Sequence, residues 1–473
     1  MPRRLSIPLG LTLALLPGAA APQARRAAPP DPIQRDYQSI ASRIIAAATA
    51  DSSAWNTLAE LTDGFGSRLS GSDALEHAID WIETRMKDDG LENVHTEPVM
   101  VPHWVRGNEK AELVEPRRAN LPMLGLGGSV ATPKEGVQAE VLVVSSFDDL
   151  KTHAADARGK IVLFDVPFTS YGQTVAYRGV GAIEAAKAGA VACLIRAVGP
   201  FGMRTPHTGS MAPYDSSVKR IAAAAITMED AAMLHRMQAR GQKIVVRLQM
   251  EAETLPDAPS RNVMGELAGR EAPDEVVVFG GHVDSWDVGT GAMDDGGGMM
   301  IAWQAVRLLK KLGLRPRRTI RAVGWTNEEN GGRGGEAYRA AHQNELGKDV
   351  AAIESDGGTF KFRGFGFSGG DSGYAVVKQI AKLLKPLGAD TVFAGGGGAD
   401  IGPIMREGVP GMSHNVDGTR YFWFHHTDAD NVDKIDPREL AENVAAMAVM
   451  AFVLADLPER LPRGGKPVGR PER

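Results

Sequence analysis

One short stretch of the sequence concentrates the residue types that bind metal ions. Residues 280–294 read Gly-Gly-His-Val-Asp-Ser-Trp-Asp-Val-Gly-Thr-Gly-Ala-Met-Asp, with His282 near the start and Asp294 at the end, and the Glu328-Glu329 pair follows. Histidine nitrogens and carboxylate oxygens bind divalent zinc, and one carboxylate can bridge two ions. A second, unbound carboxylate can accept a proton from water activated at such a site. The pattern is typical of a two-metal hydrolase.

These residues follow three apolar segments that we predict to be neighbouring strands of one sheet. The predicted strands are 275–280, 319–325 and 350–353. His282 follows the first strand, the Glu328-Glu329 pair follows the second, and Asp356 follows the third. In open α/β sheets, ligands bind at the edge formed by the carboxyl ends of the strands. We therefore expect these side chains to meet at one edge of the sheet.

Acidic side chains gathered at this edge would repel one another without cations between them. Two like charges about 4 Å apart cost on the order of 4 kcal/mol at an effective dielectric of roughly 20. The alternative is that these acids are scattered surface residues, which predicts lysines or arginines among them. None lies between Gly280 and Met300. The pattern favours a metal site.

The remaining candidates would have different roles at such a site: metal binding, proton transfer and orientation of a ligand. Adjacent side chains at the end of a strand point apart, so one of Glu328 and Glu329 would hold metal and the other would carry protons. A further ligand is expected from segment 425–430, which reads His-His-Thr-Asp-Ala-Asp. Asp284, two residues after His282, is a candidate for orienting a ligand ring.

The motifs resemble those of the co-catalytic zinc exopeptidases, a family that includes bacterial aminopeptidases and relatives of the transferrin receptor. The resemblance extends over nearly all of the chain after its first residues. It is carried by Gly281-His-Val-Asp-Ser-Trp-Asp-Val-Gly, Gly291-Ala-Met-Asp-Asp-Gly-Gly-Gly, Trp325-Thr-Asn-Glu-Glu, Glu354-Ser-Asp, Tyr421-Phe-Trp-Phe-His-His, Asn120-Leu-Pro-Met-Leu-Gly-Leu-Gly and Ala157-Arg-Gly-Lys-Ile-Val.

This resemblance implies a pair of zinc ions held by five side chains, with Glu328 as the general base. The implied ligands are His282 and Asp356 on one ion, Glu329 and His426 on the other, and Asp294 between the two. It also implies a homodimer that hydrolyses dipeptides and other small peptides. An aminopeptidase acting on longer peptides is the alternative activity. A catalytically inactive binding protein with a peptidase fold is a further alternative.

Two positions depart from the pattern that is common in this family. Asn327 stands before the paired glutamates, where many relatives have alanine. Ala399 precedes Asp400, where many relatives have serine or threonine. The first departure is expected to affect only the surroundings of the ligands, and the second bears on the contacts to substrate.

The fold is predicted to be α/β, a three-layer sandwich with a mostly parallel central sheet. The catalytic domain is expected to comprise residues 34–112 and 250–458, with helices predicted at 73–89, 299–312 and 437–454. A β-rich insert at 113–249, which resembles a protease-associated domain, would interrupt it. A flexible tail would follow at 459–473.

The predicted insert lacks clusters of acidic or metal-binding residues, so we expect it to take no part in the chemistry. Its histidines, His153, His207 and His235, stand singly. A lone histidine is more often a solvated or packed residue than a metal ligand. Within the insert, strands are predicted at 139–147, 160–165 and 190–195, and a helix at 181–188.

Composition excludes several other classes of protein. The 473 residues suffice for two domains, and 43% hydrophobic with 23% charged residues are ordinary for a soluble globular protein. A net charge of -5 gives no general attraction to nucleic acid or anionic membranes. Cys193 is the only cysteine, which excludes an intrachain disulfide and a thiolate metal cluster.

The first residues are predicted to be a signal peptide, 1–22. Arg3 and Arg4 precede an apolar run at 7–16, and small residues follow. The run is shorter than the roughly 17–25 residues of a membrane-spanning helix. We therefore expect a secreted or periplasmic protein without membrane association after cleavage.

Overall fold

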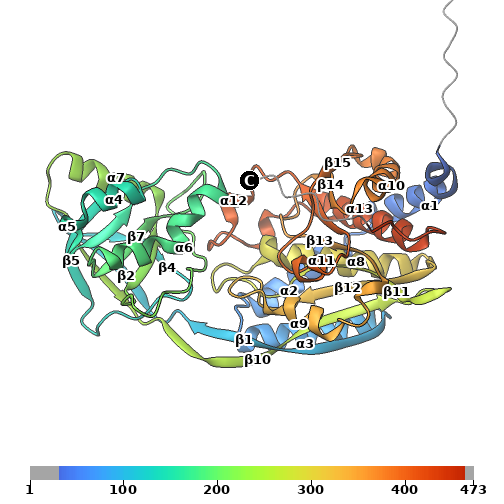
Figure 1. The fold of residues 1–473 in the computed structure, drawn as a ribbon, viewed down its shortest axis with the longest axis horizontal. Helices are drawn as coiled ribbons and strands as arrows, with labels where there is room; N and C mark the ends of the chain where they lie inside the picture. Colours follow the sequence, from blue (N-terminus) through green and yellow to red (C-terminus); the bar gives the residue numbers. More distant parts are fainter. Residues whose placement is uncertain (1–30, 464–473) are drawn as a thin grey trace, which may run out of the picture.

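The computed structural model describes residues 31–463, so the predicted signal peptide and the last residues of the predicted tail lie outside the described residues. Two sheets lie side by side along the long axis of the molecule (Figure 1). Each sheet has eight strands. In the described part of the chain, no helix is long and apolar enough to cross a membrane.

The first sheet holds the predicted chemistry. Its order is β1 (Glu92–Val105), β10 (Glu253–Leu267), β12 (Arg318–Trp325), β11 (Ala272–His282), β13 (Asp349–Glu354), β16 (Gly411–Val416), β14 (Phe362–Ser368) and β15 (Val392–Ala394). Strands β12, β11, β13 and β16 are parallel neighbours. The pairings β1–β10, β10–β12 and β14–β16 are antiparallel, as is common towards the half-solvated edges of a sheet. The predicted parallel sheet thus describes the centre, and the whole sheet is mixed.

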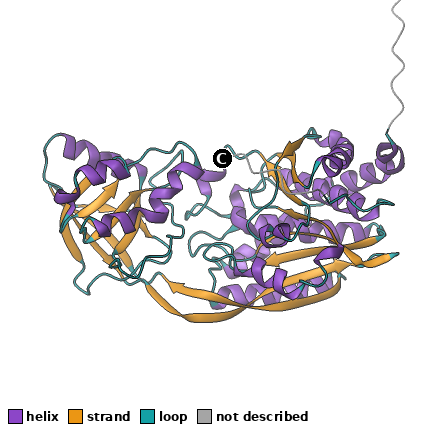
Figure 2. Ribbon diagram, in the orientation of Figure 1, coloured by secondary structure: helices purple, strands orange, loops and turns teal. Residues whose placement is uncertain are grey.

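The central strands are buried on both faces, which explains their continuous apolar sequence. Val277 and Phe279 of β11 pack in one core, whereas Val276 and Val278 pack in another on the opposite face. Helices cover the first face: α1 (Pro32–Thr49), α2 (Ser53–Phe65), α3 (Asp73–Asp88), α8 (Gly297–Lys311), α10 (Asp371–Ala381), η3 (Lys382–Leu387) and α13 (Pro437–Asp456). Helices α9 (Arg333–Ala341) and α11 (Gly402–Arg406) and the short turn η2 (Leu346–Lys348) lie on the second (Figure 2). The predicted α/β class is confirmed, as a mixed α/β fold with large sheets.

Helix termini follow local capping chemistry. At α3 the capping residue is Ser72, whose side chain accepts from the backbone N–H of Leu75. At α13 the capping residue is Asp436, whose side chain accepts from the N–H groups of Arg438 and Glu439. Serine and aspartate both satisfy the free N–H groups of a first helical turn.

The second sheet is built from the middle of the chain. Its order is β3 (Ala119–Leu121), β2 (Glu109–Glu115), β9 (Val245–Met250), β5 (Val137–Val144), β6 (Ile161–Phe164), β7 (Ala192–Arg196), β8 (Ala222–Ile226) and β4 (Met123–Gly125). Its helices are α4 (Phe147–Thr152), α5 (Ala154–Ala157), α6 (Tyr171–Lys187) and α7 (Met228–Ala239). This part of the chain is therefore mixed rather than simply β-rich. Helix α6 begins well before the predicted residue 181, because its first turns carry glycines and polar residues that hide its periodicity.

Two further features are the strand pair that links the two sheets and the chain segment that follows α13. The long antiparallel pair β1 and β10 runs from the first sheet towards the second (Figure 1). Residues 459–463 were predicted to begin a flexible tail, but they contact strand β13 of the first sheet. Leu461 is buried, and the Arg460 and Arg463 guanidinium groups both donate to the carbonyl oxygen of Asp349.

Candidate metal centre

The candidate ligands meet at the carboxyl ends of three parallel strands. His282 is the last residue of β11, and the Glu328-Glu329 pair follows β12. Asp356 follows β13. Strand β11 pairs in parallel with both β12 and β13, so the three ends share one edge. Asp294 lies in the short helix η1 (Ala292–Gly296), which follows β11 after a loop.

Asp294 lies between two pairs of side chains. His282 Nε2 is 3.3 Å from Asp294 Oδ1 and 3.7 Å from Asp356 Oδ1. On the other side, His426 Nε2 is 3.0 Å from Glu329 Oε2 and 3.3 Å from Asp294 Oδ2. The geometry groups ligand atoms of His282, Asp294 and Glu329 within 4.8 Å of one another. The structure thus brings the five predicted ligands together.

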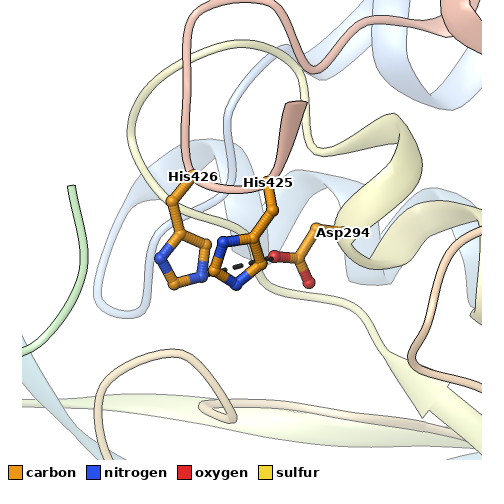
Figure 3. A group of neighbouring side chains, drawn as sticks. All are labelled: Asp294, His425 and His426. Atoms are coloured by element: carbon orange, nitrogen blue, oxygen red, sulfur yellow. Dashed lines mark ion pairs between the residues drawn. The ribbon is translucent and has the colours of Figure 1, made fainter. Parts of the chain in front are cut away.

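The two adjacent histidines follow the short helix α12 (Tyr421–Phe424), and both approach Asp294. Their rings are stacked, with centroids 3.5 Å apart. Figure 3 shows both rings beside the Asp294 carboxylate. His425 Nε2 is 3.6 Å from Asp294 Oδ2, farther than His426 Nε2 at 3.3 Å. His426 also places its Nδ1 3.2 Å from the carbonyl oxygen of Thr208. Because a metal-bound ring usually donates its other N–H to a carbonyl or carboxylate, the geometry favours His426.

Asp284 positions the paired glutamates as well as His282. Its carboxylate accepts from the backbone N–H groups of Glu328, at 3.1 Å, and Glu329, at 3.3 Å. Its carbonyl oxygen lies 2.8 Å from His282 Nδ1, whereas its carboxylate is 3.7 Å from that atom. The backbone of Asp284, rather than its side chain, therefore orients the ring.

Two further buried carboxylates, to which sequence reasoning gave no role of this kind, hold the loop of Asp294. Asp430 accepts from the backbone N–H groups of Met293 at 2.6 Å and Asp294 at 3.1 Å. Asp295 accepts from the backbone N–H groups of His282 and Gly298, both at 3.1 Å. The only available signals were the Asp294-Asp295 adjacency and the inclusion of Asp430 in segment 425–430.

The departure at Asn327 has a backbone explanation. Asn327 has a φ of 67°, in the left-handed region where asparagine is enriched among non-glycine residues. Its Nδ2 donates to Ser70 Oγ at 3.0 Å, and its Oδ1 accepts from the N–H of Arg333 at 3.2 Å. The side chain thus fixes the turn that presents the paired glutamates.

Burial and mutual repulsion shift the acidity of the site carboxyls. Burial raises the pKa of Glu328 well above its usual value, and the charges of Asp356, Glu329 and Asp294 add to the rise. Burial and the Asp294 charge raise the pKa of Glu329 to about 7. For Asp294, hydrogen bonds with His282 and His426 outweigh the effect of burial and hold its pKa well below the usual range.

A buried cation that the sequence did not suggest lies beside the acids. Arg68 is completely buried and donates to the carbonyl oxygens of Val283 at 2.8 Å and Thr290 at 2.7 Å. Burial lowers its pKa to about 10, against the charges of Asp430 and Asp284. Arg68 is far from the acidic motifs in the sequence, so the spacing of these motifs could not predict that it lies beside them.

The donor atoms fit a divalent cation. Within the described residues, His282 Nε2, Asp294 Oδ2 and Glu329 Oε1 are buried and have no hydrogen-bond partner. Buried polar atoms in native proteins are nearly always paired, so unpaired lone pairs that converge point to a missing partner of positive charge. Nitrogen and carboxylate oxygen donors together suit zinc.

The histidines of the middle part of the chain behave differently from one another. His153 Nδ1 lies 3.0 Å from Asp149 Oδ1, and His235 Nδ1 lies 2.7 Å from Asp165 Oδ2, as expected for histidines outside a metal site. His207 is buried, and burial together with the nearby His426 lowers its pKa to about 3. The next residue, Thr208, donates its backbone N–H to the carbonyl oxygen of His426 at 2.9 Å, so the middle part of the chain reaches the candidate centre.

Comparison with known proteins identifies the family. The model of peptidase family M28 matches residues 262–451. Carboxypeptidase Q of Mus musculus is 47% identical over 431 residues, covering 90% of this chain and 92% of that protein. Carboxypeptidase Q of Bos taurus is 48% identical over 414 residues, covering 88% of each. The chain belongs to peptidase family M28.

A solved M28 structure has the same fold. The M28 peptidase precursor of Shewanella amazonensis superposes with a TM-score of 0.87 at 36% identity, covering 92% of this chain and 100% of that one. The predicted resemblance to the exopeptidase family is confirmed, and the similarity to carboxypeptidase Q makes it more specific. This M28 chain is a metallopeptidase, and the M28 match contains all five candidate ligands and Glu328.

Proposed function

We propose that this M28 peptidase is a di-zinc exopeptidase that hydrolyses dipeptides and other small peptides. The observation that carries the proposal is the position of Asp294, with one carboxylate oxygen facing His282 and the other facing His426. A carboxylate with both oxygens engaged by separate ligand sets is suited to bridge two cations.

In this proposal, His282 and Asp356 hold one zinc, and Glu329 and His426 hold the other. Asp294 would bridge the two. When bound, the cations would polarise the scissile carbonyl and lower the pKa of a water molecule towards neutrality. The arrangement of Asp284, Asp295 and Asp430 around the ligands limits their movement, because each of these carboxylates accepts backbone N–H groups.

Glu328 is proposed to move the proton. Asp284 fixes its backbone N–H, and burial together with the charges of nearby carboxylates raises its pKa, which makes the carboxylate a stronger base. Glu328 takes a proton from the attacking water and returns it to the nitrogen of the leaving amine. The peptide bond breaks as that nitrogen becomes an amine.

The Glu328→Gln variant tests this role. The amide keeps the size of the side chain but cannot accept the proton, so turnover should fall by about 10²–10⁴-fold. Zinc content, measured by atomic emission after dialysis, should equal that of the parent protein. A variant with full activity would exclude Glu328 as the base, and one that had lost its zinc would make it a ligand.

Substrate comparison separates the proposed activity from the alternatives. The similarity to carboxypeptidase Q supports a preference for small peptides with a free C-terminus. Rates on a dipeptide, its C-terminally amidated form and a tetrapeptide should then fall in that order. Equal rates on the amide and the acid, with good turnover of the tetrapeptide, would favour an aminopeptidase. A zinc-loaded protein without activity on any of these substrates would favour the binding protein.

We also propose the remaining organisation from the sequence. Residues 34–112 and 250–458 would form the catalytic domain, 113–249 a protease-associated insert and 1–22 a signal peptide of a secreted or periplasmic protein. The chain would act as a homodimer. N-terminal sequencing of the exported protein and sedimentation equilibrium would test the cleavage site and the dimer.

A further inference from the structure

A segment of the middle part of the chain, residues 208–210, contacts two of the candidate ligands. The Thr208 N–H donates to the carbonyl oxygen of His426 at 2.9 Å, and the Thr208 carbonyl oxygen lies 3.2 Å from His426 Nδ1. Ser210 Oγ donates to the carbonyl oxygen of Glu329 at 3.0 Å. His426 and Glu329 are the two side chains assigned above to the same zinc.

These contacts hold His426 in a conformation that it would not otherwise favour. Its φ is 62°, a left-handed value that is uncommon for histidine and persists where surrounding structure holds it. Thr208 binds both its backbone and its ring. An Nδ1–H that donates to the Thr208 carbonyl leaves the lone pair on Nε2, the atom that faces Glu329 and Asp294.

Thr208 is in turn held by two arginines. Arg106 Nη2 donates to Thr208 Oγ1 at 3.3 Å, and Thr208 Oγ1 donates to the carbonyl oxygen of Gly125 at 2.8 Å. Arg178 of helix α6 donates through Nη1 to the Thr208 carbonyl oxygen at 3.3 Å, and the same Nη1 lies 3.3 Å from His426 Nδ1. The Arg178 guanidinium therefore lies beside the contact between the Thr208 carbonyl and the His426 ring.

Gly209 makes room for this guanidinium. A Cβ at Gly209 would lie 2.4 Å from Arg178 Cζ, and the φ of Gly209 is 133°. Arg178 is 7% exposed, and its Nη2 donates to the Tyr171 hydroxyl at 2.7 Å. Close packing without a side chain at 209 keeps Arg178 against Thr208.

The other pair of ligands is held in a different way. His282 donates its backbone N–H to Asp295, and its Nδ1 lies against the carbonyl oxygen of Asp284. Both partners belong to the loop and short helix that follow β11. Asp284 also supports the other site, because its carboxylate accepts from the Glu329 N–H. The contacts that segment 208–210 adds to His426 and Glu329 come from the middle part of the chain.

We propose that Arg178 and segment 208–210 are positioning residues for the Glu329–His426 zinc site and not for the His282–Asp356 site. The middle part of the chain would then set the affinity for one zinc ion of the pair. This inference rests on the di-zinc function proposed above.

The experiment measures zinc binding by the full-length protein rather than activity alone. Gly209→Ala displaces the guanidinium, and Arg178→Met removes it at similar length. Zinc affinity is measured by competition with a chelator, beginning from metal-free protein. Loss of a partner that orients a metal ligand typically weakens binding 10–100-fold. Each variant should therefore bind one equivalent about 10–100-fold more weakly, with the other equivalent unchanged. Arg178→Lys keeps a charged donor and should lose less.

Matched glycines provide the controls. Gly179 lies in α6 next to Arg178, and Gly241 has a left-handed φ of 72°. Apart from the glycine's two chain neighbours and the nearby backbone of its own helix, no heavy atom of the described residues lies within 4 Å of a Cβ placed at either position. Gly179→Ala tests a methyl group beside Arg178, and Gly241→Ala tests backbone strain without the clash. Both should bind two equivalents as the parent does.

The outcomes separate this inference from the function on which it rests. Equal weakening of both equivalents, or none, would overturn the inference while leaving a two-zinc parent intact. A parent that binds no zinc would overturn both. Circular dichroism of the metal-free variants identifies misfolding. If Gly209→Ala does not fold, the Arg178→Met and Arg178→Lys pair decides the result.

Discussion

His426 and Asn327 both have a left-handed backbone at the candidate centre, with φ values of 62° and 67°. Such conformations cost free energy for residues with a side chain, so they persist where other contacts fix them. Asn327 is fixed by its own amide, whereas His426 is fixed by Thr208. At the scale of single residues, the centre depends on turns that hold ligands in place as well as on the ligands themselves.

Substitution of Asn327 tests the turn. Asn327→Ala loses the hydrogen bonds to Ser70 and Arg333 and keeps a Cβ at a left-handed φ, so it should destabilise the protein by about 2 kcal/mol. Asn327→Gly loses the same bonds without the steric cost and should be less destabilised by about 1 kcal/mol. Urea unfolding measures both values. Equal stability of the two variants would contradict a backbone role.

The adjacent histidines give a second test at this scale. His426→Asn should remove one of two bound zinc equivalents, because His426 Nε2 faces both Glu329 and Asp294. His425→Asn should keep both, because its Nε2 is farther from Asp294. Zinc counting after dialysis distinguishes the two. The reverse result would assign the ligand to His425.

At the scale of elements, the sequence predicted the strands that carry the site with good accuracy. Strands β11, β12 and β13 are continuous apolar runs followed by polar residues, so these segments were readable. Strand β11 nevertheless extends to His282, beyond its predicted end at 280, and the order β12-β11-β13 was not predicted. The contacts of Arg68 and Arg178 with the centre could not be predicted. Each side chain reaches the centre from a distant part of the sequence, and the periodicity of a segment does not indicate such a contact. Helix α6 was predicted too short for a local reason, the glycines in its first turns.

The edge strand β1 is joined to the end of helix α9 by a charged cluster that gives a pH-dependent stability. Glu97 Oε1 lies 2.9 Å from His342 Nε2 and 3.7 Å from His95 Nε2. Burial opposes ionisation of Glu97, but the two histidines prevail and lower its pKa to about 2. The pKa values of His95 and His342 are raised in turn, with Glu97 among the causes and Arg321 opposing.

The directions of these pKa shifts define the pH range in which the cluster stabilises the fold. Stability from Glu97 is present above its ordinary pKa of 4.5 and is lost as pH falls towards about 2. Stability from the histidines is present below their ordinary pKa of 6.5 and is lost as pH rises through their raised values. Glu97→Gln should therefore cost about 1–3 kcal/mol near pH 5.5 and less near pH 9. Urea unfolding at the two pH values checks this, and a cost independent of pH would exclude the cluster as its source.

At the scale of the whole molecule, the centre joins segments from both ends and the middle of the chain. Arg68 lies beside the centre, and the loops after β11, β12 and β13 carry its ligands. Segment 208–210 contacts His426 and Glu329. An ion that binds the ligands only as the folded state arranges them should stabilise the fold as a whole. Repulsion among the buried carboxylates acts in the opposite sense when no cation is present.

Zinc should therefore raise the thermal unfolding midpoint of the metal-free protein. Free zinc at 100 times its dissociation constant adds about 2.7 kcal/mol through one site, and chelation removes that contribution. His426→Asn should retain part of the shift, because the His282–Asp356 site would still bind. His282→Asn serves as the reciprocal control, since it leaves the support from segment 208–210 intact. A midpoint that zinc and chelator leave unchanged in the parent would mean that the buried acids tolerate one another without a cation, and the two-metal proposal would lose its physical basis.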